Sequence, residues 1–334
     1  MRQFSPDQLV ISLANSHVLA RCVQVVAELG VADAMGDEPT SAAELAGHTR
    51  TNADALNRML RLLAAHGLFA WTPTGYAHTP ASRVLRTDHP QSMRSFARMI
   101  GMPALWNGFT ELEKAARTGA PALDWAGLVA YFADHSDEAT LFNQAMVGKS
   151  GSVVPAVLAA YDFTPFHSIV DIGGGRGHLL RAILDQAPAA SGVLFELPHV
   201  IADAAEIAST RLKLHGGDFF VDSLPAADAY VLMEVIHDWA DADAARILAS
   251  VRRAAPAHAR LLIVESLVSE SPGPHFSKVL DIIMLAVTGG RERTPSEYEA
   301  LLQAAGFRLE GVIATNSQYS VVDARVADPL SRKG

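Results

Sequence analysis

Residues 167–178 read HSIVDIGGGRGH, a short β-branched run that continues directly into a loop rich in glycine. A helix is predicted next, over Leu179–Gln186, and its N-terminus favours negative charge such as a carboxylate. Strand, tight loop and helix in this order are typical of a ligand site at the carboxyl end of a parallel strand. A dinucleotide fingerprint fits poorly, because counting Gly173 and Gly175 as its first two glycines leaves His178 at the third.

Beyond Phe166, β-branched runs alternate with helical segments, which predicts a parallel sheet covered on both faces. Strands are expected at 167–172, 192–195, 212–215, 229–233 and 261–264, and helices at 179–186, 199–207, 241–254 and 296–305. The chain then reads as two extended runs, 308–314 and 319–326, separated by a loop of hairpin length. An antiparallel terminal strand is unusual in a dinucleotide dehydrogenase. The fold class is therefore α/β, with a Rossmann-like sheet that ends in an antiparallel strand.

The first hundred residues read as helices with short breaks, followed by a small hairpin. Helical patterns cover 13–29, 31–35, 42–46 and 53–66, and extended runs lie at 68–71 and 76–78. Ser41 is a cap candidate, because Glu44 follows three residues later as in a capping box. The order indicates a winged-helix module, which is typical of DNA-binding regulators and of dimerisation domains. Near-equal numbers of arginines and acids, without a lysine, favour dimerisation.

Composition limits the class of protein. Of 334 residues, 49% are hydrophobic and 19% charged, so a sizeable core is expected. A net charge of −9 argues against a general nucleic-acid binder. The single cysteine, Cys22, cannot form an intrachain disulfide and fits a reducing compartment. Without a signal-peptide layout or a run of about 18 apolar residues, we expect a cytoplasmic protein with no membrane partner.

Acidic and aromatic side chains follow the second and third predicted strands. Glu196 ends the second strand, where a carboxylate can accept hydrogen bonds from both ribose hydroxyls. Asp218 follows the third strand and can accept from an adenine amino group, while Phe219 can pack on the adenine face. For Asp218 the alternative is a solvated loop acid. Together with Asp171 at the end of the first strand, these residues predict an adenosine-type ligand at this edge.

A histidine and two carboxylates are predicted at neighbouring loops of the same edge. His237-Asp238-Trp239 follows the fourth strand, Glu265 ends the fifth, and Glu292 lies in the loop Gly289–Pro295. Such carboxylates can hold an imidazole tautomer and stabilise the imidazolium that forms on deprotonation of a substrate. The alternatives are a satisfied core histidine, and carboxylates that serve as ion-pair partners of nearby arginines. The sequence has no pair of histidines at metal-ligand spacing, and a single cysteine cannot form a set of thiolate ligands, so no metal site is expected.

These segments occur in the order of a known family. The chain resembles the caffeate and hydroxyindole type of O-methyltransferases, including bacterial members that tailor natural products. The resemblance rests on the segments 170–177, 195–200, 217–220, 237–239, 264–265 and 289–294. It implies a class I methyltransferase fold, S-adenosyl-L-methionine as cofactor with S-adenosyl-L-homocysteine as product, and a homodimer. The implied domains are a dimerisation domain at 1–100, a helical linker and pocket roof at 101–165, and a catalytic domain at 166–334.

The resemblance also implies roles for individual residues. The methionine part of the cofactor would contact Asp171, Gly173, Gly174 and Gly175, the ribose Glu196, and the adenine Asp218 and Phe219. His237 would be the general base, with Glu265 and Glu292 beside it. Met284 matches a family methionine that touches substrate, and Asp238 is expected to contact substrate as well. Independently of the resemblance, Trp106, Phe142 and Met146 supply large apolar surface in the helical stretch 90–165. We expect these three to contact substrate from the roof of a pocket, and the alternative is plain interdomain core. One departure concerns the cofactor site: Met233 stands where many members have a lysine.

The expected reaction is methylation of a hydroxyl, phenolic in our interpretation, on a small aromatic or polycyclic compound. Three alternatives stay open at this point: an N-methyltransferase, a homologue that hydroxylates or decarboxylates on the same fold, and a winged-helix regulator that senses a ligand. An NAD-linked oxidoreductase is a further alternative, and the retention of His237 and Glu292 argues against the non-methylating homologues.

Overall fold

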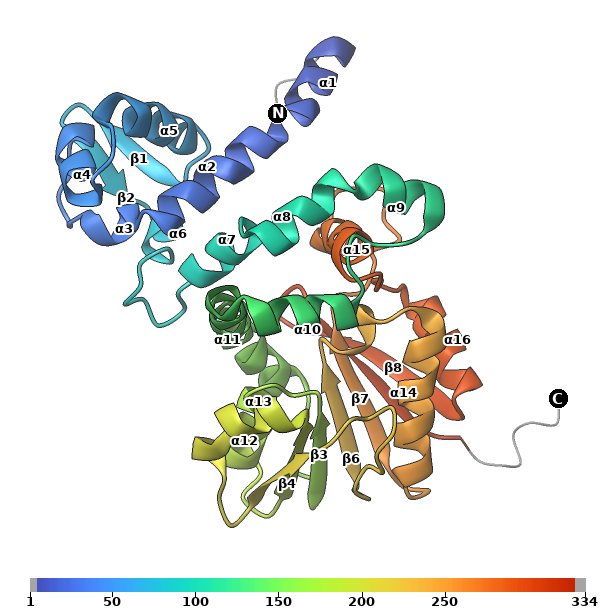
Figure 1. The fold of residues 1–334 in the computed structure, drawn as a ribbon. Helices are drawn as coiled ribbons and strands as arrows, with labels where there is room; N and C mark the ends of the chain where they lie inside the picture. Colours follow the sequence, from blue (N-terminus) through green and yellow to red (C-terminus); the bar gives the residue numbers. More distant parts are fainter. Residues whose placement is uncertain (1–4, 328–334) are drawn as a thin grey trace. The chain divides into compact units, whose positions relative to one another are not determined.

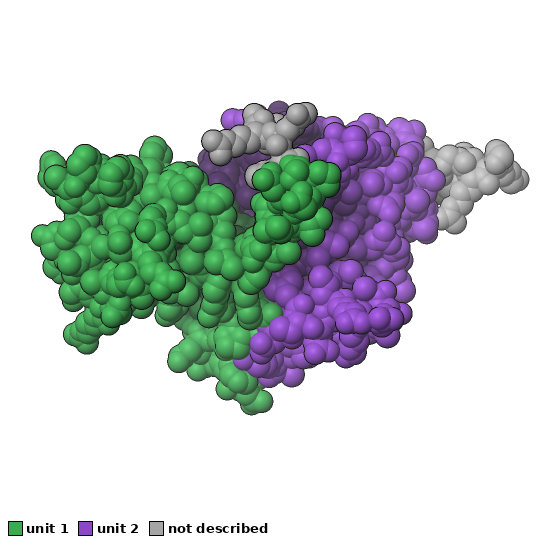
Figure 2. Space-filling view, turned by 90° about the horizontal axis from the view of Figure 1, so that it is seen from above, with its two compact units in different colours: residues 1–106, 132–149 green, residues 107–131, 150–334 purple. Residues whose placement is uncertain are grey.

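The computed structural model describes residues 5–327 and divides into two compact units. Unit 1 comprises residues 1–106 and 132–149, and unit 2 comprises residues 107–131 and 150–334 (Figures 1 and 2). The chain passes between the units within the helices α8 (Pro103–Thr110), α10 (Trp125–Asp134) and α11 (Ser136–Ala160). The middle stretch therefore contributes to both units, and the expected boundaries at residues 100 and 165 stay predictions.

Unit 1 is mostly helical and contains one small hairpin. Its remaining elements are α1 (Pro6–Ala14), α2 (Ser16–Glu28), α3 (Val31–Ala34), α4 (Ala42–Thr49), α5 (Ala53–Ala65), β1 (Phe69–Thr72), β2 (Gly75–His78), α6 (Pro80–Arg83) and α7 (Arg94–Ile100). Leucines at helical spacing on α4 and α5 build its core, with Leu45, Leu56, Leu60 and Leu63 fully buried. The expected sequence of helices and hairpin is confirmed.

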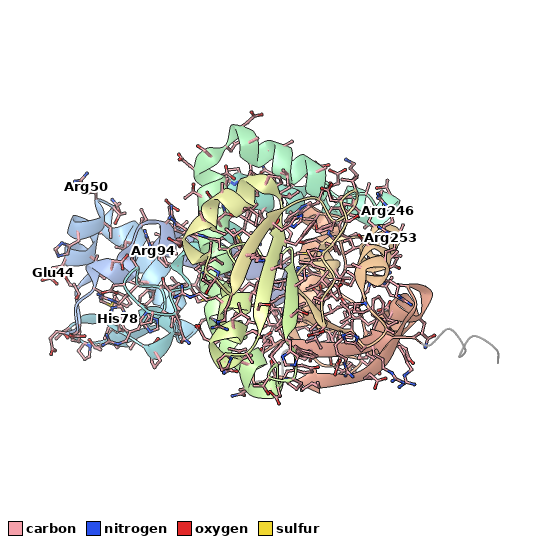
Figure 3. All side chains as sticks on the ribbon, turned by 90° about the horizontal axis from the view of Figure 1, so that it is seen from below. Glu44, Arg50, His78, Arg94, Arg246 and Arg253 are labelled. Carbon is pink, nitrogen blue, oxygen red and sulfur yellow. The ribbon has the colours of Figure 1, made fainter. Side chains whose placement is uncertain are left out.

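The ends of α4 follow local rules that the sequence makes visible. Ser41 accepts a hydrogen bond from the backbone N–H of Glu44, and the Glu44 carboxylate accepts one from the backbone N–H of Ser41. The helix continues three residues beyond the predicted end at Ala46 and stops at Arg50, which adopts the left-handed conformation with φ 54° (Figure 3). An arginine carries no sequence signal for this turn, so the prediction ended the helix early.

A third strand-like segment joins the hairpin. The backbones of Thr40 and Tyr76 exchange two hydrogen bonds of 2.8 and 2.9 Å. Gly75 makes this approach feasible, because a Cβ atom there would lie 2.3 Å from the carbonyl oxygen of Thr40. The wing is thus tied to the segment that precedes α4, a non-local pairing without a local sequence signal.

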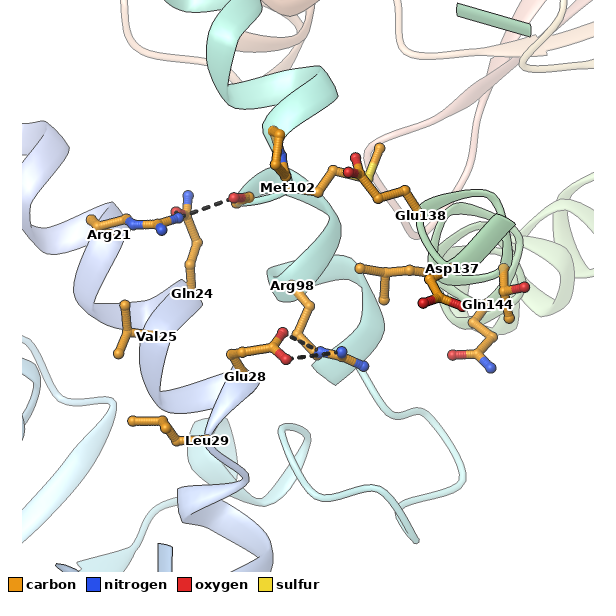
Figure 4. Close-up of a pocket in the computed structure, with 14 residues that line it drawn as sticks. Arg21, Gln24, Val25, Glu28, Leu29, Arg98, Met102, Asp137, Glu138 and Gln144 are labelled. Atoms are coloured by element: carbon orange, nitrogen blue, oxygen red, sulfur yellow. Dashed lines mark hydrogen bonds and ion pairs between the residues drawn. The ribbon is translucent and has the colours of Figure 1, made fainter. Parts of the chain in front are cut away.

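Polar side chains join α2 to α7 around a hollow of about 580 Å³ in unit 1 (Figure 4). Arg98 and Glu28 form an ion pair with an N–O distance of 2.6 Å. Arg21 donates hydrogen bonds of 3.0 Å to the Gln24 side chain and to the carbonyl of Gly101. The charged groups that line the hollow from these two helices are thus largely engaged with each other.

The N-terminal helices carry an exposed apolar face. Within the described residues, Pro6–Glu28 is long and apolar enough to cross a membrane by length and composition alone, which differs from the expectation that no such run exists. This is weak evidence for a membrane span, because the core helix of a soluble protein and a signal sequence share the same length and composition. Five large apolar side chains here are more than 40% exposed: Leu9, Val10, Ile11, Leu13 and Val18. Several large exposed apolar side chains on neighbouring helices are typical of an interaction surface.

Unit 2 is built on a seven-stranded sheet. The strands are β3 (Ser168–Ile172), β4 (Ser191–Glu196), β5 (Leu212–Gly216), β6 (Ala229–Met233), β7 (Arg260–Glu265), β8 (Phe307–Ala314) and β9 (Ser320–Val326). The helices are α9 (Leu112–Thr118), α12 (His178–Gln186), α13 (Pro198–Asp203), α14 (Asp241–Ala254), α15 (Phe276–Val287) and α16 (Pro295–Ala304). One prediction is wrong in part: the helix expected over 199–207 ends at Asp203, and a 3-10 turn follows at Ala205–Ile207.

The strands run in the order β5-β4-β3-β6-β7-β9-β8. Strands β3 to β7 are mutually parallel, and β9 is antiparallel to both of its neighbours, which confirms the expected antiparallel strand. Alternate residues of β6 face opposite sides: Tyr230 and Leu232 pack with α14 and α16, whereas Ala229 and Val231 pack with α12 and the end of α11. The loops that follow the parallel strands therefore all lie at the same edge of the sheet, and helices pack on both faces of that sheet.

Candidate active site

The loop after β3 combines a buried carboxylate with closely packed glycines. Asp171 is 1% exposed, and neither of its carboxylate oxygens has a hydrogen-bond partner in the structure. A Cβ atom on Gly174 would lie 2.3 Å from Oδ2 of Asp171, so the aspartate side chain itself requires this glycine. Gly175, with φ 56°, has open space where its Cβ would be. A ligand can therefore approach the backbone at Gly175.

Glu196 at the end of β4 is held against the same loop. Its carboxylate accepts hydrogen bonds from the backbone N–H groups of Gly175 (3.0 Å) and Leu197 (2.7 Å). Burial raises the pKa of Glu196 in spite of these hydrogen bonds. Burial and the nearby charge of Glu196 raise the pKa of Asp171 to about 7. Two carboxyl groups thus lie close together in a region that favours a positive ligand group.

Asp218 and Phe219 lie in the turn after β5. The Asp218 carboxylate accepts from the backbone N–H of Phe220 at 2.8 Å, which closes the turn on itself. The ring of Phe219 meets the rings of Phe220 and Trp239 edge to face, with centroid distances of 4.8 and 6.0 Å. The guanidinium carbon of Arg246 on α14 lies 4.6 Å from the centroid of the Phe220 ring. The turn is therefore closed by a hydrogen bond, and its aromatic rings contact Trp239, which follows the turn that carries His237.

His237 is 5% exposed and lies in the 3-10 turn η2 (Ile236–Asp238) after β6. Its Nδ1 is 2.6 Å from Oε1 of Glu292, and its Nε2 is 3.7 Å from Oδ1 of Asp238. An ionised carboxylate only accepts, so Nδ1 carries a proton. Burial alone lowers the pKa of the imidazole, but the charges of Asp238, Glu292 and Glu265 and the hydrogen bond to Glu292 outweigh it and raise the pKa of His237 to about 10.

The side chain of Glu265 contacts the main chain of the turn η2. It is fully buried at the end of β7, and its Oε1 accepts a 3.0 Å hydrogen bond from the backbone N–H of His237. The hydroxyl of Tyr298 on α16 donates to its other oxygen. Burial raises the pKa of Glu265 to about 7, against the opposing charge of His237. The three predicted groups His237, Glu265 and Glu292 are thus brought together, and Glu265 holds the histidine backbone while Glu292 holds its ring.

The loop after α15 contacts this turn closely. The backbone N–H of Arg291 donates a 2.8 Å hydrogen bond to the carbonyl of His237. A Cβ atom on Gly290 would lie 2.0 Å from that carbonyl oxygen, so only glycine allows the approach. Asp281 on α15 accepts a 2.9 Å hydrogen bond from the backbone N–H of Glu292. The position of the Glu292 carboxylate is therefore set by its neighbours in the loop and by α15.

The predicted substrate contacts fall in both units. Asp238 and Met284 lie in unit 2, and Met284 is half-buried on α15, 3.8 Å from the hydroxyl of Thr288 through its sulfur. Trp106, Phe142 and Met146 lie in unit 1 and are half-buried, with Trp106 under the Arg21 guanidinium and Phe142 against Phe132. Their role toward a substrate stays a prediction.

Sequence reasoning missed two residues that complete the site. Tyr298 is fully buried beside Glu265, and Asp281 fixes the backbone of Glu292. Asp281 stands three residues before Met284, and the resemblance to the family pointed to the methionine alone. Tyr298 follows the capping box of α16 and reads as a core residue. Neither carries a motif, because both act through partners distant in the sequence.

Two family models match the chain. Residues 109–308 match an O-methyltransferase domain, and residues 11–88 match an O-methyltransferase dimerisation domain. The chain belongs to the O-methyltransferase family. Its cofactor is S-adenosyl-L-methionine, the resemblance stated from the sequence is confirmed, and the N-terminal module is the dimerisation domain of that family.

Relatives of known activity extend along nearly the whole chain. The phenazine O-methyltransferase of Lysobacter antibioticus is 38% identical over 96% of both chains. The 8-amino-8-demethylriboflavin N,N-dimethyltransferase of Streptomyces davaonensis is 34% identical over 92% of both. An O-methyltransferase of neocarzinostatin biosynthesis, solved with S-adenosylmethionine and 2-hydroxy-5-methyl naphthoic acid, is 31% identical with a TM-score of 0.75, covering 92% of this chain and 95% of that one.

The residues around the glycine loop fit this cofactor. The two unpartnered oxygens of buried Asp171 require a donor, and S-adenosylmethionine carries a positively charged amino group and a sulfonium. The open space at Gly175 allows a ligand to reach the backbone beside Glu196. The carboxyl groups and the open glycine therefore suit a cationic nucleoside better than a phosphate ligand.

The raised pKa of Asp171 predicts a measurable dependence of stability on pH. Because the folded protein binds the Asp171 proton more tightly than the unfolded chain, this group lowers stability as pH rises from about 4 to about 7. Asp171→Asn removes that loss. Urea unfolding of the cofactor-free protein should show that the variant loses less stability than the wild type between about pH 5 and about pH 8.

Asp185→Asn is the matched control, since this aspartate is exposed on α12. It should leave the pH slope of the wild type unchanged. Equal slopes for the wild type and Asp171→Asn would show that Asp171 does not retain its proton in the folded state.

Proposed function

We propose that the protein transfers the methyl group of S-adenosylmethionine to a phenolic hydroxyl of a small aromatic or polycyclic compound, with His237 as general base. The observation that carries this proposal is the buried imidazole at the carboxyl edge of the sheet, with Nδ1 held 2.6 Å from Glu292. A proton fixed on Nδ1 leaves Nε2 as the atom that can accept a proton from a substrate.

When bound, S-adenosylmethionine supplies a methyl group already activated by the sulfonium charge. What remains for the chain is to orient the acceptor, to take its proton and to stabilise the resulting imidazolium. Glu292 meets the last requirement through a buried, charge-assisted hydrogen bond. Glu265 contributes by fixing the backbone N–H of His237. We assign His237 as the catalytic residue and these two carboxylates as residues that orient and charge it.

We also propose how the cofactor is held. Asp171 and the backbone of Gly173, Gly174 and Gly175 would contact its methionine part, and Glu196 its ribose hydroxyls. Asp218 and Phe219 would contact the adenine, and the edge-to-face cluster of Phe219 supports this by holding its ring in a fixed plane. Support for Asp171 comes from its two unpartnered buried oxygens.

Replacement of His237 by alanine tests the base directly. General-base catalysis contributes about 10²- to 10⁴-fold, so kcat of His237→Ala should fall by that amount, while the Kd for S-adenosylhomocysteine stays near the wild-type value. The measurements are methyl-transfer kinetics on a phenolic acceptor and calorimetric titration of the product cofactor.

His258→Ala is the control for this variant, because His258 also pairs with an aspartate, Asp228 at 2.9 Å, but is largely exposed. It should retain full turnover. Wild-type turnover by His237→Ala would remove His237 from the mechanism and leave positioning of the substrate as the source of catalysis.

The carboxylates around His237 predict an alkaline pH dependence. With the pKa of His237 raised to about 10, kcat/KM should increase with pH through the neutral range, since the base must be unprotonated to act. Glu292→Gln removes a negative charge 2.6 Å from Nδ1 and should move the rising part of the profile to lower pH, with a lower maximum.

The exposed carboxylate of Glu299 on α16 provides the comparison, and Glu299→Gln should reproduce the wild-type profile. A Glu292→Gln profile that rises at the wild-type pH would mean that Glu292 does not set the proton affinity of His237. The profile of kcat/KM is the relevant one, because it reports groups of the free enzyme.

Methylation of an amine is the second candidate. The observation that favours it is the dimethyltransferase relative, which acts on 8-amino-8-demethylriboflavin and matches 92% of this chain. A neutral aromatic amine loses its proton only as the new bond forms, so it depends less on a base than a phenol does. Paired assays with a phenol and the corresponding aniline separate the two, and turnover of the aniline alone would overturn the hydroxyl assignment.

We further propose that two copies associate through the exposed apolar face of α1 and α2. Support comes from the dimerisation-domain match at residues 11–88, which includes Ile11, Leu13 and Val18 of that face. Burial of these side chains against a second copy would remove apolar surface from water. This also accounts for the apolar run Pro6–Glu28 without a membrane, consistent with the cytoplasmic location expected from the sequence.

Leu13→Glu tests this association, because a charge at a 66% exposed position leaves the monomer fold intact and opposes burial. Sedimentation should show a dimer for the wild type and a monomer for the variant. Val312→Glu, at an exposed apolar position of β8 in unit 2, should remain dimeric. A dimeric Leu13→Glu protein would place the interface elsewhere.

A further inference from the structure

Arg293 is the largest fully buried side chain of the described residues, with 1% of its surface exposed. A buried guanidinium is costly unless its charge is paired and its N–H groups are satisfied. Here Nε and Nη2 donate to Oδ1 of Asp241 at 3.0 and 2.9 Å. The Asp241 side chain is 60% exposed at the first turn of α14, so its charge remains hydrated while it neutralises the arginine.

The other donors of Arg293 go to main-chain carbonyls. Nη1 donates to the carbonyl of Ile236 at 3.1 Å and to that of Arg291 at 3.4 Å, and Nη2 donates to the carbonyl of Trp239 at 2.8 Å. All five N–H bonds of the guanidinium are therefore used. Two of the three carbonyls flank His237, one residue before it and two residues after it. The guanidinium thus spans the turn η2 from end to end.

The main chain of His237 itself is held from two other directions. Its N–H donates to Glu265, and its carbonyl accepts from the backbone N–H of Arg291. Neither contact prevents the turn from pivoting about the His237 backbone, because both act on that one residue. A rigid fork that binds the carbonyls on either side removes this freedom, and only the planar guanidinium presents donors at the required separation.

We propose that Arg293 is a positioning residue for catalysis, whose guanidinium fixes the His237 turn so that the imidazole stays aligned between Glu292 and the acceptor hydroxyl. This inference rests on the proposed role of His237 as general base. The hydrogen bonds of Arg293 go to Asp241 and to main-chain carbonyls, so it acts through the backbone at Ile236 and Trp239.

Arg293→Lys is the first test, since lysine keeps the charge but carries its donors on one atom and cannot bridge the two carbonyls. We expect kcat to fall about 10- to 100-fold, with the KM for the acceptor and the Kd for S-adenosylhomocysteine little changed. Arg260→Lys is the matched control, because Arg260 forms a similar two-pronged pair with Asp323 on β9. It should reduce stability without reducing kcat.

A second readout needs no turnover. In NMR titrations of the cofactor-free protein, the pKa of the His237 ring should move toward that of an ordinary histidine in Arg293→Lys, because a mobile turn weakens the contacts with Glu292, Asp238 and Glu265. In Arg260→Lys the ring should titrate as in the wild type. A purely structural role for Arg293 would lower the unfolding temperature and leave both the His237 titration and kcat of the folded protein unchanged.

Asp241 offers a second variant if Arg293→Lys fails to fold. Asp241→Ala removes the exposed carboxylate that pairs with Arg293 through one oxygen and with Arg291 through the other. Asp243→Ala removes a carboxylate of the same first helical turn that pairs with Arg246 instead. Only Asp241→Ala should lower kcat and shift the His237 titration.

A folded Arg293→Lys or Asp241→Ala protein with wild-type kcat and titration overturns the proposal. A wild-type protein that methylates no acceptor overturns the function instead, and the titration comparison then still decides the role of Arg293.

Discussion

The buried pair of His237 and Glu292 is the interaction on which the arrangement of the site depends. A charge pair that is almost completely removed from water persists only when hydrogen bonds satisfy it and its geometry is fixed. The surrounding structure fixes the geometry of the pair: Glu265 and Tyr298 lie on one side, Gly290 and Arg291 on another, and Asp281 holds the backbone of Glu292. Within the described residues, the second carboxylate oxygen of Glu292, Oε2, is buried without a hydrogen-bond partner. The packed sheet, covered by helices on both faces, holds the strand ends from which these groups project.

Two further buried acids, Asp171 and Glu196, lie at the neighbouring strand ends. In contrast to His237 and Glu292, they carry charges of the same sign. Asp171 and Glu196 are close to each other, and within the described residues neither carboxylate oxygen of Asp171 has a hydrogen-bond partner. Their region is therefore unfavourable for folding and favourable for a positively charged ligand, as is common where binding sites reduce stability. One edge of the sheet thus contains a pair of opposite charges for chemistry and two like-charged carboxyl groups for binding.

Much of this could be predicted from the sequence, because the informative signals are local. The alternation of β-branched and helical runs identified the fold class, and the capping box at Ser41 identified the start of α4. The residues that follow successive strands predicted that His237, Glu265 and Glu292 lie at one site. What could not be predicted depends on contacts between distant segments. The pairing of Thr40 with Tyr76, the hydroxyl of Tyr298 on Glu265 and the five-donor role of Arg293 leave no periodic pattern.

The position of β9 has a consequence for biosynthesis of the chain. It follows the other six strands in sequence, yet it lies between β7 and β8. Until it is translated, the apolar edge of β7 has no partner, and such an edge can pair with other nascent chains. Unit 2 therefore completes its sheet only after nearly all of its residues have been translated, and we expect it to depend more on chaperones during synthesis than the local helices of α4 and α5 do.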